Sequence, residues 1–194
     1  KSGYGFTHEN HFSAYNNKLN VKELCSDTIY TFENMGFEPY MVIGVGKKQV
    51  TSKVRSECNM LDICANYIQP DNLLEFGDFI YYAFTYKFVQ GDVRIYGFIG
   101  SKKDNYQALF NLGEGIANDL DGGPNILPLI TKNDNTIVTL IDAITLKKYI
   151  ASNEFNKSTP KYPDKKKELE KLATRMKETD NPILVLVKLE NDIK

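Results

Sequence analysis

The sequence predicts a mainly β chain of antiparallel, four-stranded, blade-like sheets, with a helical insertion before the last strand. Tyr and Phe contribute 12 and 11 of the 194 residues, and aromatic side chains favour the pleated surface of strands. Apolar and polar residues alternate in short runs separated by Gly, Asn and Asp, which is typical of hairpins. Four such runs follow one another within residues 73–112, the chain content of one β-propeller blade.

The first two sheets are expected within residues 12–46 and 67–112. In the first, the run Thr28–Phe32 alternates with period two, Asn34–Gly36 forms a turn, and Phe37–Val45 is the next strand. In the second, the aromatic run Phe79–Tyr86 is the strongest strand signal. Residues 47–66 form a connector with room for a short helix.

The third sheet is expected within residues 124–189. Its hairpin is formed by residues 126–131 and 136–141, and a helix over about 164–178 is inserted before the last strand, because apolar residues recur there at helical spacing. The apolar run Ile183–Leu189 follows, and we expect it to pair within the hairpin's sheet and to leave one side of that sheet for a partner. The whole chain, 1–194, is then a single partial β-propeller domain of about three blades.

Charge and hydropathy narrow the class of protein. The 24 basic and 25 acidic residues give a net charge of -1, which argues against a general nucleic-acid partner. No apolar stretch reaches the length of about 18 residues that a membrane span requires. The polar start Lys1–Asn10 has neither Met nor a signal segment, so we expect a truncated, proteolysed or split-gene product.

The three cysteines, Cys25, Cys58 and Cys64, are an odd number, so at least one is expected to be a free thiol unless it pairs between chains. Buried thiols and a Cys58–Cys64 disulfide are both compatible with the spacing.

Three segments together resemble a known family. Asn118–Pro124 is similar to an "NDIDGGP" loop, the segment Cys25–Tyr30 with the following hairpin is similar to a "DTIY … P-Y-x-I-x-x-G" pattern, and Asp180–Leu189 resembles a terminal signature. These are features of the six-bladed β-propeller proteins (NHL/TolB-like) of Bacteroidetes. Leu120 replaces the usual isoleucine of the loop.

The resemblance implies the C-terminal half of such a propeller. It also implies an exported protein, periplasmic or at the cell surface, with a lipid anchor possible on a missing N-terminus. Because about three blades make only half of a six-bladed ring, two alternative partners are expected. One is a complementing N-terminal half, and the other is a second copy that closes the ring as a homodimer.

The Gly-rich loop 113–124 is one candidate site. Its oxygen-bearing side chains suit calcium, although their spacing is not that of an EF-hand. The alternative is a turn in which glycines supply positive φ and the Asx side chains bond their own backbone. The candidate metal ligands are Glu114, Asn118, Asp119 and Asp121.

The aromatic run supplies the second candidate. Tyr81, Tyr82 and Tyr86 could form a stacking platform for a carbohydrate or aromatic ligand, or they could serve blade-to-blade packing. The motif His8-Glu9-x-His11 has the wrong spacing for a zincin site.

No catalytic constellation is predicted. The leading hypothesis is therefore a non-enzymatic binding or interaction scaffold of the cell envelope, with a protein or carbohydrate ligand and no cofactor. The alternative is a calcium-dependent hydrolase or lactonase of the propeller type, most of whose channel residues would lie in a missing N-terminal half.

Overall fold

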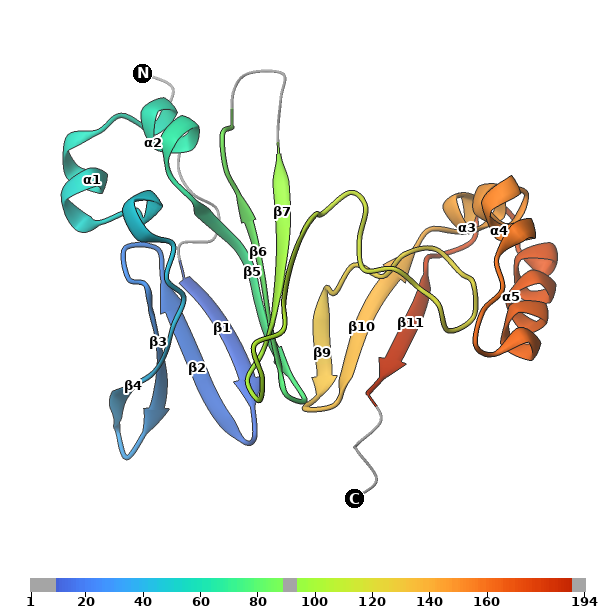
Figure 1. Cartoon of the computed structure of the whole chain (residues 1–194), viewed down its shortest axis with the longest axis horizontal. Coiled ribbons are helices and arrows are strands. Elements are labelled where there is room, and N and C mark those ends of the chain that lie inside the picture. Colours follow the sequence, from blue (N-terminus) through green and yellow to red (C-terminus); the bar gives the residue numbers. More distant parts are fainter. Residues whose placement is uncertain (1–9, 89–93, 190–194) are drawn as a thin grey trace. The chain divides into compact units, whose positions relative to one another are not determined.

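The computed structural model describes residues 10–88 and 94–189, and it is mainly β, with three antiparallel sheets and five α-helices in these ranges (Figure 1). The chain divides into two compact units. Unit 1 contains the described residues up to Gly113 together with the turn Asn133–Asn135, and unit 2 contains Glu114–Lys132 and Thr136–Leu189.

The first sheet of unit 1 is a four-stranded meander, drawn in blue in Figure 1. Its two outer hairpins close with two-residue turns, Asn16-Asn17 and Asn34-Met35, in which all four residues have positive φ. Such turns match the right-handed twist of the flanking strands, and Asn tolerates this conformation well. The strands, in the order β1-β2-β3-β4, are β1 (Asn10–Tyr15), β2 (Lys18–Glu23), β3 (Thr28–Glu33) and β4 (Gly36–Val42).

The second sheet of unit 1 has the order β5-β6-β7-β8 and confirms the predicted four-stranded unit. Its core with the first sheet is built from Ile29, Leu73, Ile80 and Tyr82. The turn predicted at residues 90–92 lies outside the described residues. The strands are β5 (Gln69–Phe76), β6 (Phe79–Thr85), β7 (Ile95–Ser101) and β8 (Gln107–Asn111).

The connector between these sheets holds a short 3-10 helix η1 (Gly46–Lys48) and two helices, α1 (Ser52–Glu57) and α2 (Met60–Asn66). Thr51 and Asn59 cap α1 and α2, because their side chains accept hydrogen bonds from the amides of Val54 and Asp62. A second small core of Leu24, Val50 and Ile63 anchors this connector.

All three cysteines are free, so no Cys58–Cys64 disulfide forms. Cys25 and Cys58 pack against the connector's core as small apolar side chains.

Unit 2 contains a three-stranded sheet of order β11-β10-β9 and three helices. The last strand pairs with β10 in the register Thr136↔Lys188 to Ile141↔Ile183, which confirms the predicted partner of Ile183–Leu189. The elements are β9 (Ile130–Asn133), β10 (Thr136–Ile141), α3 (Ala143–Ile150), α4 (Asn153–Lys157), α5 (Pro163–Arg175) and β11 (Ile183–Lys188).

The third sheet has three strands, those of the predicted hairpin and the predicted last strand, and not the four that were expected of a blade-like sheet. The first predicted strand starts at Ile130 rather than at residue 126, because Ile126 forms a two-way backbone bridge with Ile116 in the Gly-rich loop. Pro128 has no N–H to donate to a ladder. The described residues thus form three separate sheets and no closed barrel or propeller.

Helix α5 ends at Arg175, three residues before the predicted end. The Lys147 ammonium donates to the carbonyls of Ala173 and Met176, at 3.2 and 2.9 Å, and thereby satisfies acceptors that the helix end leaves open. The Asp180 carboxylate accepts from the amide of Lys177, which forms the turn toward β11.

Candidate functional site

The sheet β1–β4 places its polar side chains inside and its apolar side chains outside. Successive residues of a strand point to opposite faces, so the pairing register assigns each side chain to a face. One face is buried within unit 1 and carries His11, Ser13, Asn20, Lys22 and Thr31 beside Ile29. The opposite face carries Phe12, Leu19, Phe32 and Phe37, and all four are exposed.

We call this second face the open face of β1–β4. Its side chains form contiguous rows, because Leu19 pairs with Phe32 and Phe32 pairs with Phe37 across the strands. The rings of Phe32 and Phe37 lie 5.2 Å apart, and Phe12 and Phe37 are 64% and 62% exposed. Contiguous apolar surface of this kind marks an interaction surface more often than scattered single side chains do.

The buried face is held to the second sheet by the carboxylate of Glu75, which is only 1% exposed. Its Oε1 accepts from the Tyr40 hydroxyl at 2.6 Å and from the Lys102 ammonium at 2.7 Å. Its Oε2 accepts from the Asn20 amide at 3.1 Å, and the Asn20 oxygen accepts in turn from Thr31 at 2.6 Å. A buried charge is tolerated only when it is paired and hydrogen-bonded in this way.

Burial, followed by the hydrogen bond to Glu75, raises the pKa of the Tyr40 hydroxyl well above its usual range. Tyr40 therefore remains a hydrogen-bond donor at any physiological pH. The Lys102 ammonium also lies 3.8 Å from the centre of the Tyr15 ring. The Tyr15 hydroxyl donates to the Gly77 carbonyl at 2.6 Å, so β1 is tied to the β5–β6 turn as well.

Lys22 is the second buried charge of this face, at 1% exposure. Its ammonium donates to the carbonyls of Ser26, at 2.9 Å, and Glu23, at 3.3 Å, and lies 5.7 Å from the Tyr82 ring centre. Burial lowers the pKa of Lys22 from 10.5 to about 8, and the negative charge of Asp27 opposes the shift only in part. The alternation of the sequence places Asn20 and Lys22 on the same face of the strand, but it does not show that this face is the buried one.

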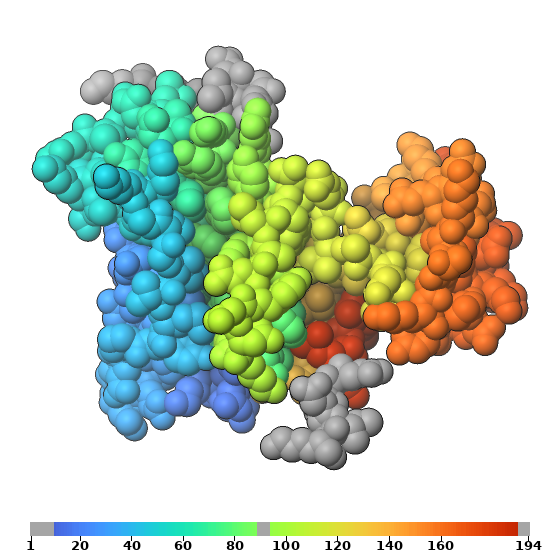
Figure 2. Space-filling view, viewed as in Figure 1, coloured from blue at the N-terminus to red at the C-terminus, as the bar shows by residue number. Residues whose placement is uncertain are grey.

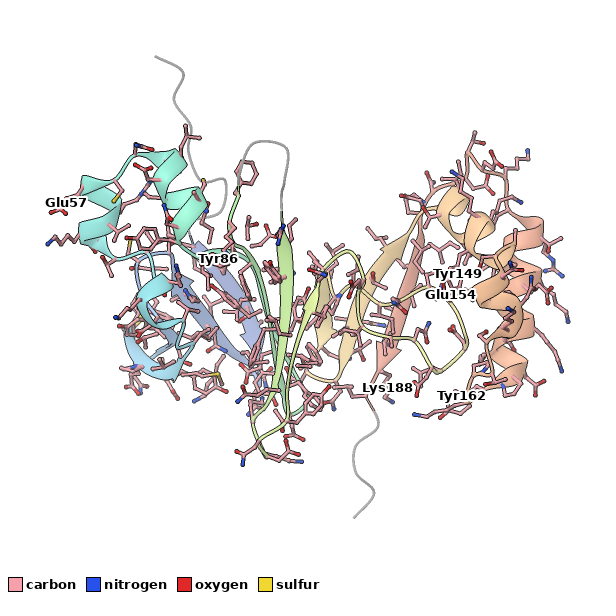
Figure 3. All side chains as sticks on the ribbon, turned by 45° about the horizontal axis from the view of Figure 1, so that its top comes forward. Glu57, Tyr86, Tyr149, Glu154, Tyr162 and Lys188 are labelled. Carbon is pink, nitrogen blue, oxygen red and sulfur yellow. The ribbon has the colours of Figure 1, made fainter. Side chains whose placement is uncertain are left out.

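The structure separates the three predicted ligand-binding tyrosines. Tyr81 and Tyr82 are adjacent in β6 and so lie on opposite faces of the sheet, where Tyr81 stacks on Phe110 and Tyr82 on Phe84. Burial raises the pKa of Tyr81 to about 12 and that of Tyr82 further. Tyr86 lies just beyond β6, within cation–π distance of Lys48 and Lys87 (Figure 3). These three side chains form no common platform, and ligand binding by any one of them stays a prediction.

In the Gly-rich loop, side chains of the predicted metal ligands form hydrogen bonds with one another and with the loop's own backbone. The Asn118 amide donates to Asp121 Oδ1 at 2.7 Å, and the same oxygen accepts from the Gly123 amide at 2.8 Å. Asn118 Oδ1 accepts from the Leu120 amide, and Asp119 forms an exposed ion pair with Lys161. These contacts match the Asx-turn interpretation of the loop.

Glu114 lies at the start of the same loop, and its carbonyl accepts from the Asn125 side chain at 2.6 Å. Within residues 10–88 and 94–189 no three His, Cys, Asp or Glu side chains gather closely enough to hold a metal ion. Calcium binding by Glu114, Asn118, Asp119 and Asp121 therefore remains only a prediction. Of the motif at residues 8–11, His8 and Glu9 lie outside the described residues.

The loop is fastened to the helical part of unit 2 by backbone hydrogen bonds. The amides of Lys161 and Tyr162 donate to the carbonyls of Asp119 and Leu120, both at 2.8 Å. In the helices themselves, the Tyr149 ring packs on Phe155 at 6.1 Å, and Glu154 lies next to Tyr149 (Figure 3). Lys166 turns inward and donates to the carbonyls of Phe155 and Ser158, so it caps α4 and does not belong to an exposed basic face.

None of the helices in the described parts of the chain combines the length and the apolarity needed to cross a membrane.

With these features, the chain falls in the class of mainly β proteins built from separate antiparallel sheets. The model of the family described as "Domain of unknown function (DUF4934)" matches residues 1–188, and the chain belongs to this family. A comparison with curated proteins gives no match.

Among solved structures, the fold is similar to that of a predicted exported protein of Bacteroides fragilis NCTC 9343, with a TM-score of 0.64 and 17% sequence identity. The match covers 93% of this chain and 49% of that chain, so this chain spans about half the length of its structural neighbour.

The buried position of Lys22 makes stability depend on pH. The folded pKa is lower than the unfolded pKa, so between pH 8 and 10.5 the unfolded chain binds more protons and stability rises with pH. We expect the wild type to gain about 1 kcal/mol over the Lys22→Met variant between pH 7 and pH 9, measured by urea unfolding. A difference between the two proteins that stays constant with pH would show that the ammonium is not desolvated in the folded state.

Gly122 is a loop position at which both the backbone conformation and the available space disfavour a side chain. Its φ is +71°, and a Cβ there would lie 2.7 Å from the Ser158 hydroxyl oxygen. We expect Gly122→Ala to lower the free energy of unfolding by about 1–3 kcal/mol through left-handed strain and overpacking. Gly113→Ala is the control, since a Cβ at Gly113 meets nothing within 4 Å. Equal thermal stability of the two variants would contradict the described loop geometry.

Proposed function

We propose that this chain is part of a non-enzymatic interaction scaffold of the cell envelope, and that the open face of β1–β4 packs against a further β-sheet. The observation that supports the proposal most strongly is the burial pattern of the sheet β1–β4. Its polar side is already buried within unit 1, while its apolar side is exposed. A sheet with this pattern is suited to being covered on both faces, as the sheets in layered β architectures are.

The occupant that fits best is a sheet contributed by the remainder of a longer polypeptide of this family type. The structural neighbour is about twice as long as the matched region, and its description as exported supports a place in the envelope. In a six-bladed propeller, each sheet packs against the sheets before and after it. The resemblance of Cys25–Tyr30 with its following hairpin, and of the Asn118–Pro124 loop, to such propellers supports the same arrangement. A periplasmic or surface location, with a lipid anchor, is part of this proposal.

The energetics favour coverage. Burying a Phe or Leu side chain contributes about 1.5–3 kcal/mol relative to leaving it exposed. Phe12, Leu19, Phe32 and Phe37 would together contribute several kcal/mol, enough to outweigh part of the entropy cost of docking a second sheet.

We expect the 194-residue chain to bind the dye anilinonaphthalene sulfonate, and the Phe12→Glu/Phe37→Glu variant to lose the part of this fluorescence that comes from the open face, without a lower melting temperature. Both side chains are more than 60% exposed, so a charge there costs little in the folded chain but disrupts an apolar surface. Leu61→Glu is the matched control, because Leu61 is 68% exposed but belongs to α2.

Light scattering on the same proteins tests whether a sheet from a longer chain or a second copy of this chain covers the open face of β1–β4. A monomeric wild type that binds the dye supports a sheet from a longer chain. A dimer that the Phe12→Glu/Phe37→Glu variant abolishes would replace that occupant with a second copy. A monomer without dye binding would overturn the proposed interaction surface.

A further inference from the structure

Unit 1 contains a cavity of about 750 Å³ between β4 and the face of the second sheet. Its volume falls in the range of about 300–1,000 Å³ that is usual for small-molecule sites. In Figure 2 the blue atoms of β4 and the segment after it lie beside the yellow-green atoms of the β7–β8 hairpin, the two sides that border this cavity. The cavity borders the side of β4 that carries Met41, whose partner Ile29 is buried, and none of Phe12, Leu19, Phe32 and Phe37 lines it.

The walls of the cavity are mostly apolar. Met41 and Ile43 come from β4 and the segment after it, and Tyr82, Phe84 and Phe98 come from β6 and β7. The aromatic rings are held rigidly, since Phe84 stacks between Tyr82 and Tyr96 at 5.6 and 5.5 Å. Rigid aromatic walls provide a large apolar contact area at a low entropic cost.

The cavity runs along β6, and its two ends differ in polarity. Ile80 pairs with Gly100 near one end, and Phe84 pairs with Tyr96 near the other. Four residues of strand span about 13 Å at roughly 3.3 Å per residue. The Phe84 end is apolar and is lined by Ile68, next to the pair Gln69–Thr85, whereas the Ile80 end carries Lys102 and Gln107.

The polar end presents hydrogen-bond donors. Lys102 has three ammonium hydrogens, and Glu75, at 2.7 Å, is its one carboxylate partner among the described residues. Lys102 lines this end of the cavity, and its ammonium also lies 3.8 Å from the centre of the Tyr15 ring. The nearby Tyr40 hydroxyl donates to Glu75. A ligand group that accepts hydrogen bonds suits the Lys102 ammonium, and a carboxylate accepts best from such a group.

Apolar surface is left uncovered along the same cavity. Leu109 on β8 lines it, on the same face of the second sheet as its partner Phe98, yet Leu109 is 63% exposed. An elongated apolar ligand beside Leu109 would cover this surface, so that hydropathy and the position of the cation favour one class of molecule.

We infer that this cavity binds a medium-chain carboxylic acid, with its carboxylate at Lys102 and its apolar chain running along β6 between Tyr82, Phe84 and Phe98. The site is distinct from the proposed docking surface, because it is built within unit 1 from residues other than Phe12, Leu19, Phe32 and Phe37.

Isothermal titration of the 194-residue chain with decanoate tests the site. We expect saturable binding of one decanoate per chain. Leu109→Glu should weaken this binding by roughly tenfold or more, because it places a like charge on the apolar wall. Leu61→Glu, which alters an equally exposed leucine outside the cavity, should bind as the wild type does. An absence of binding, or equal binding by the two variants, would overturn the site.

Decanol tests the carboxylate end without disturbing the pair between Lys102 and Glu75. We expect decanol to bind roughly tenfold more weakly than decanoate, since it lacks the charge-assisted hydrogen bond. Equal affinity would overturn the assignment of the head group to Lys102. The Phe12→Glu/Phe37→Glu variant should retain decanoate binding. Loss of binding in that variant would place the acid on the open face of β1–β4 and refute the cavity site.

Discussion

The buried carboxylate of Glu75 is the constraint on which the arrangement of unit 1 depends. It sits in β5 and collects donors from β2, from β4 and from the residue after β7. Removing one partner of such a buried pair typically costs about 3–5 kcal/mol, because the remaining charge is left without compensation. The polar side of the first sheet therefore meets the second sheet around Glu75 and the apolar cluster beside it, and the side that carries Phe12 and Phe37 faces outward.

This polar contact gives specificity rather than great stability. A well-packed apolar interface of the same size is often at least as stable as a buried ion pair. However, Glu75 accepts hydrogen bonds from Asn20 of β2 and Tyr40 of β4 at the same time, so both strands must be correctly placed against β5. The cavity lies beside this contact, and Lys102, the ion-pair partner of Glu75, lines its polar end.

Much of the local structure could be predicted from the sequence. Period-two alternation and Asn-rich turns gave the two four-stranded sheets, and the apolar run at Ile183 identified a strand that pairs with β10. The extent of the third sheet could not be predicted, because Ile126 finds a partner in the distant Ile116. At the candidate site, alternation places Tyr81 and Tyr82 on opposite faces, but it cannot tell which face of a sheet is buried. Glu75 lies within an apolar run, and its role becomes visible only when β2 and β4 supply its donors.

The open face of β1–β4 has a counterpart in unit 2. Leu140, Leu184 and Leu186 share one face of the sheet β11-β10-β9, and each is about half exposed or more, at 49%, 65% and 52%. Pairing with β10 satisfies the backbone hydrogen bonds of β11, but it does not bury the side chains on this face. Since β11 is also an edge strand, a covering partner would protect both its face and its unpaired backbone groups. The two sheets nevertheless differ, because the sheet of unit 2 is apolar on its other face as well, where Ile137 is 4% exposed, whereas the buried face of β1–β4 is mostly polar.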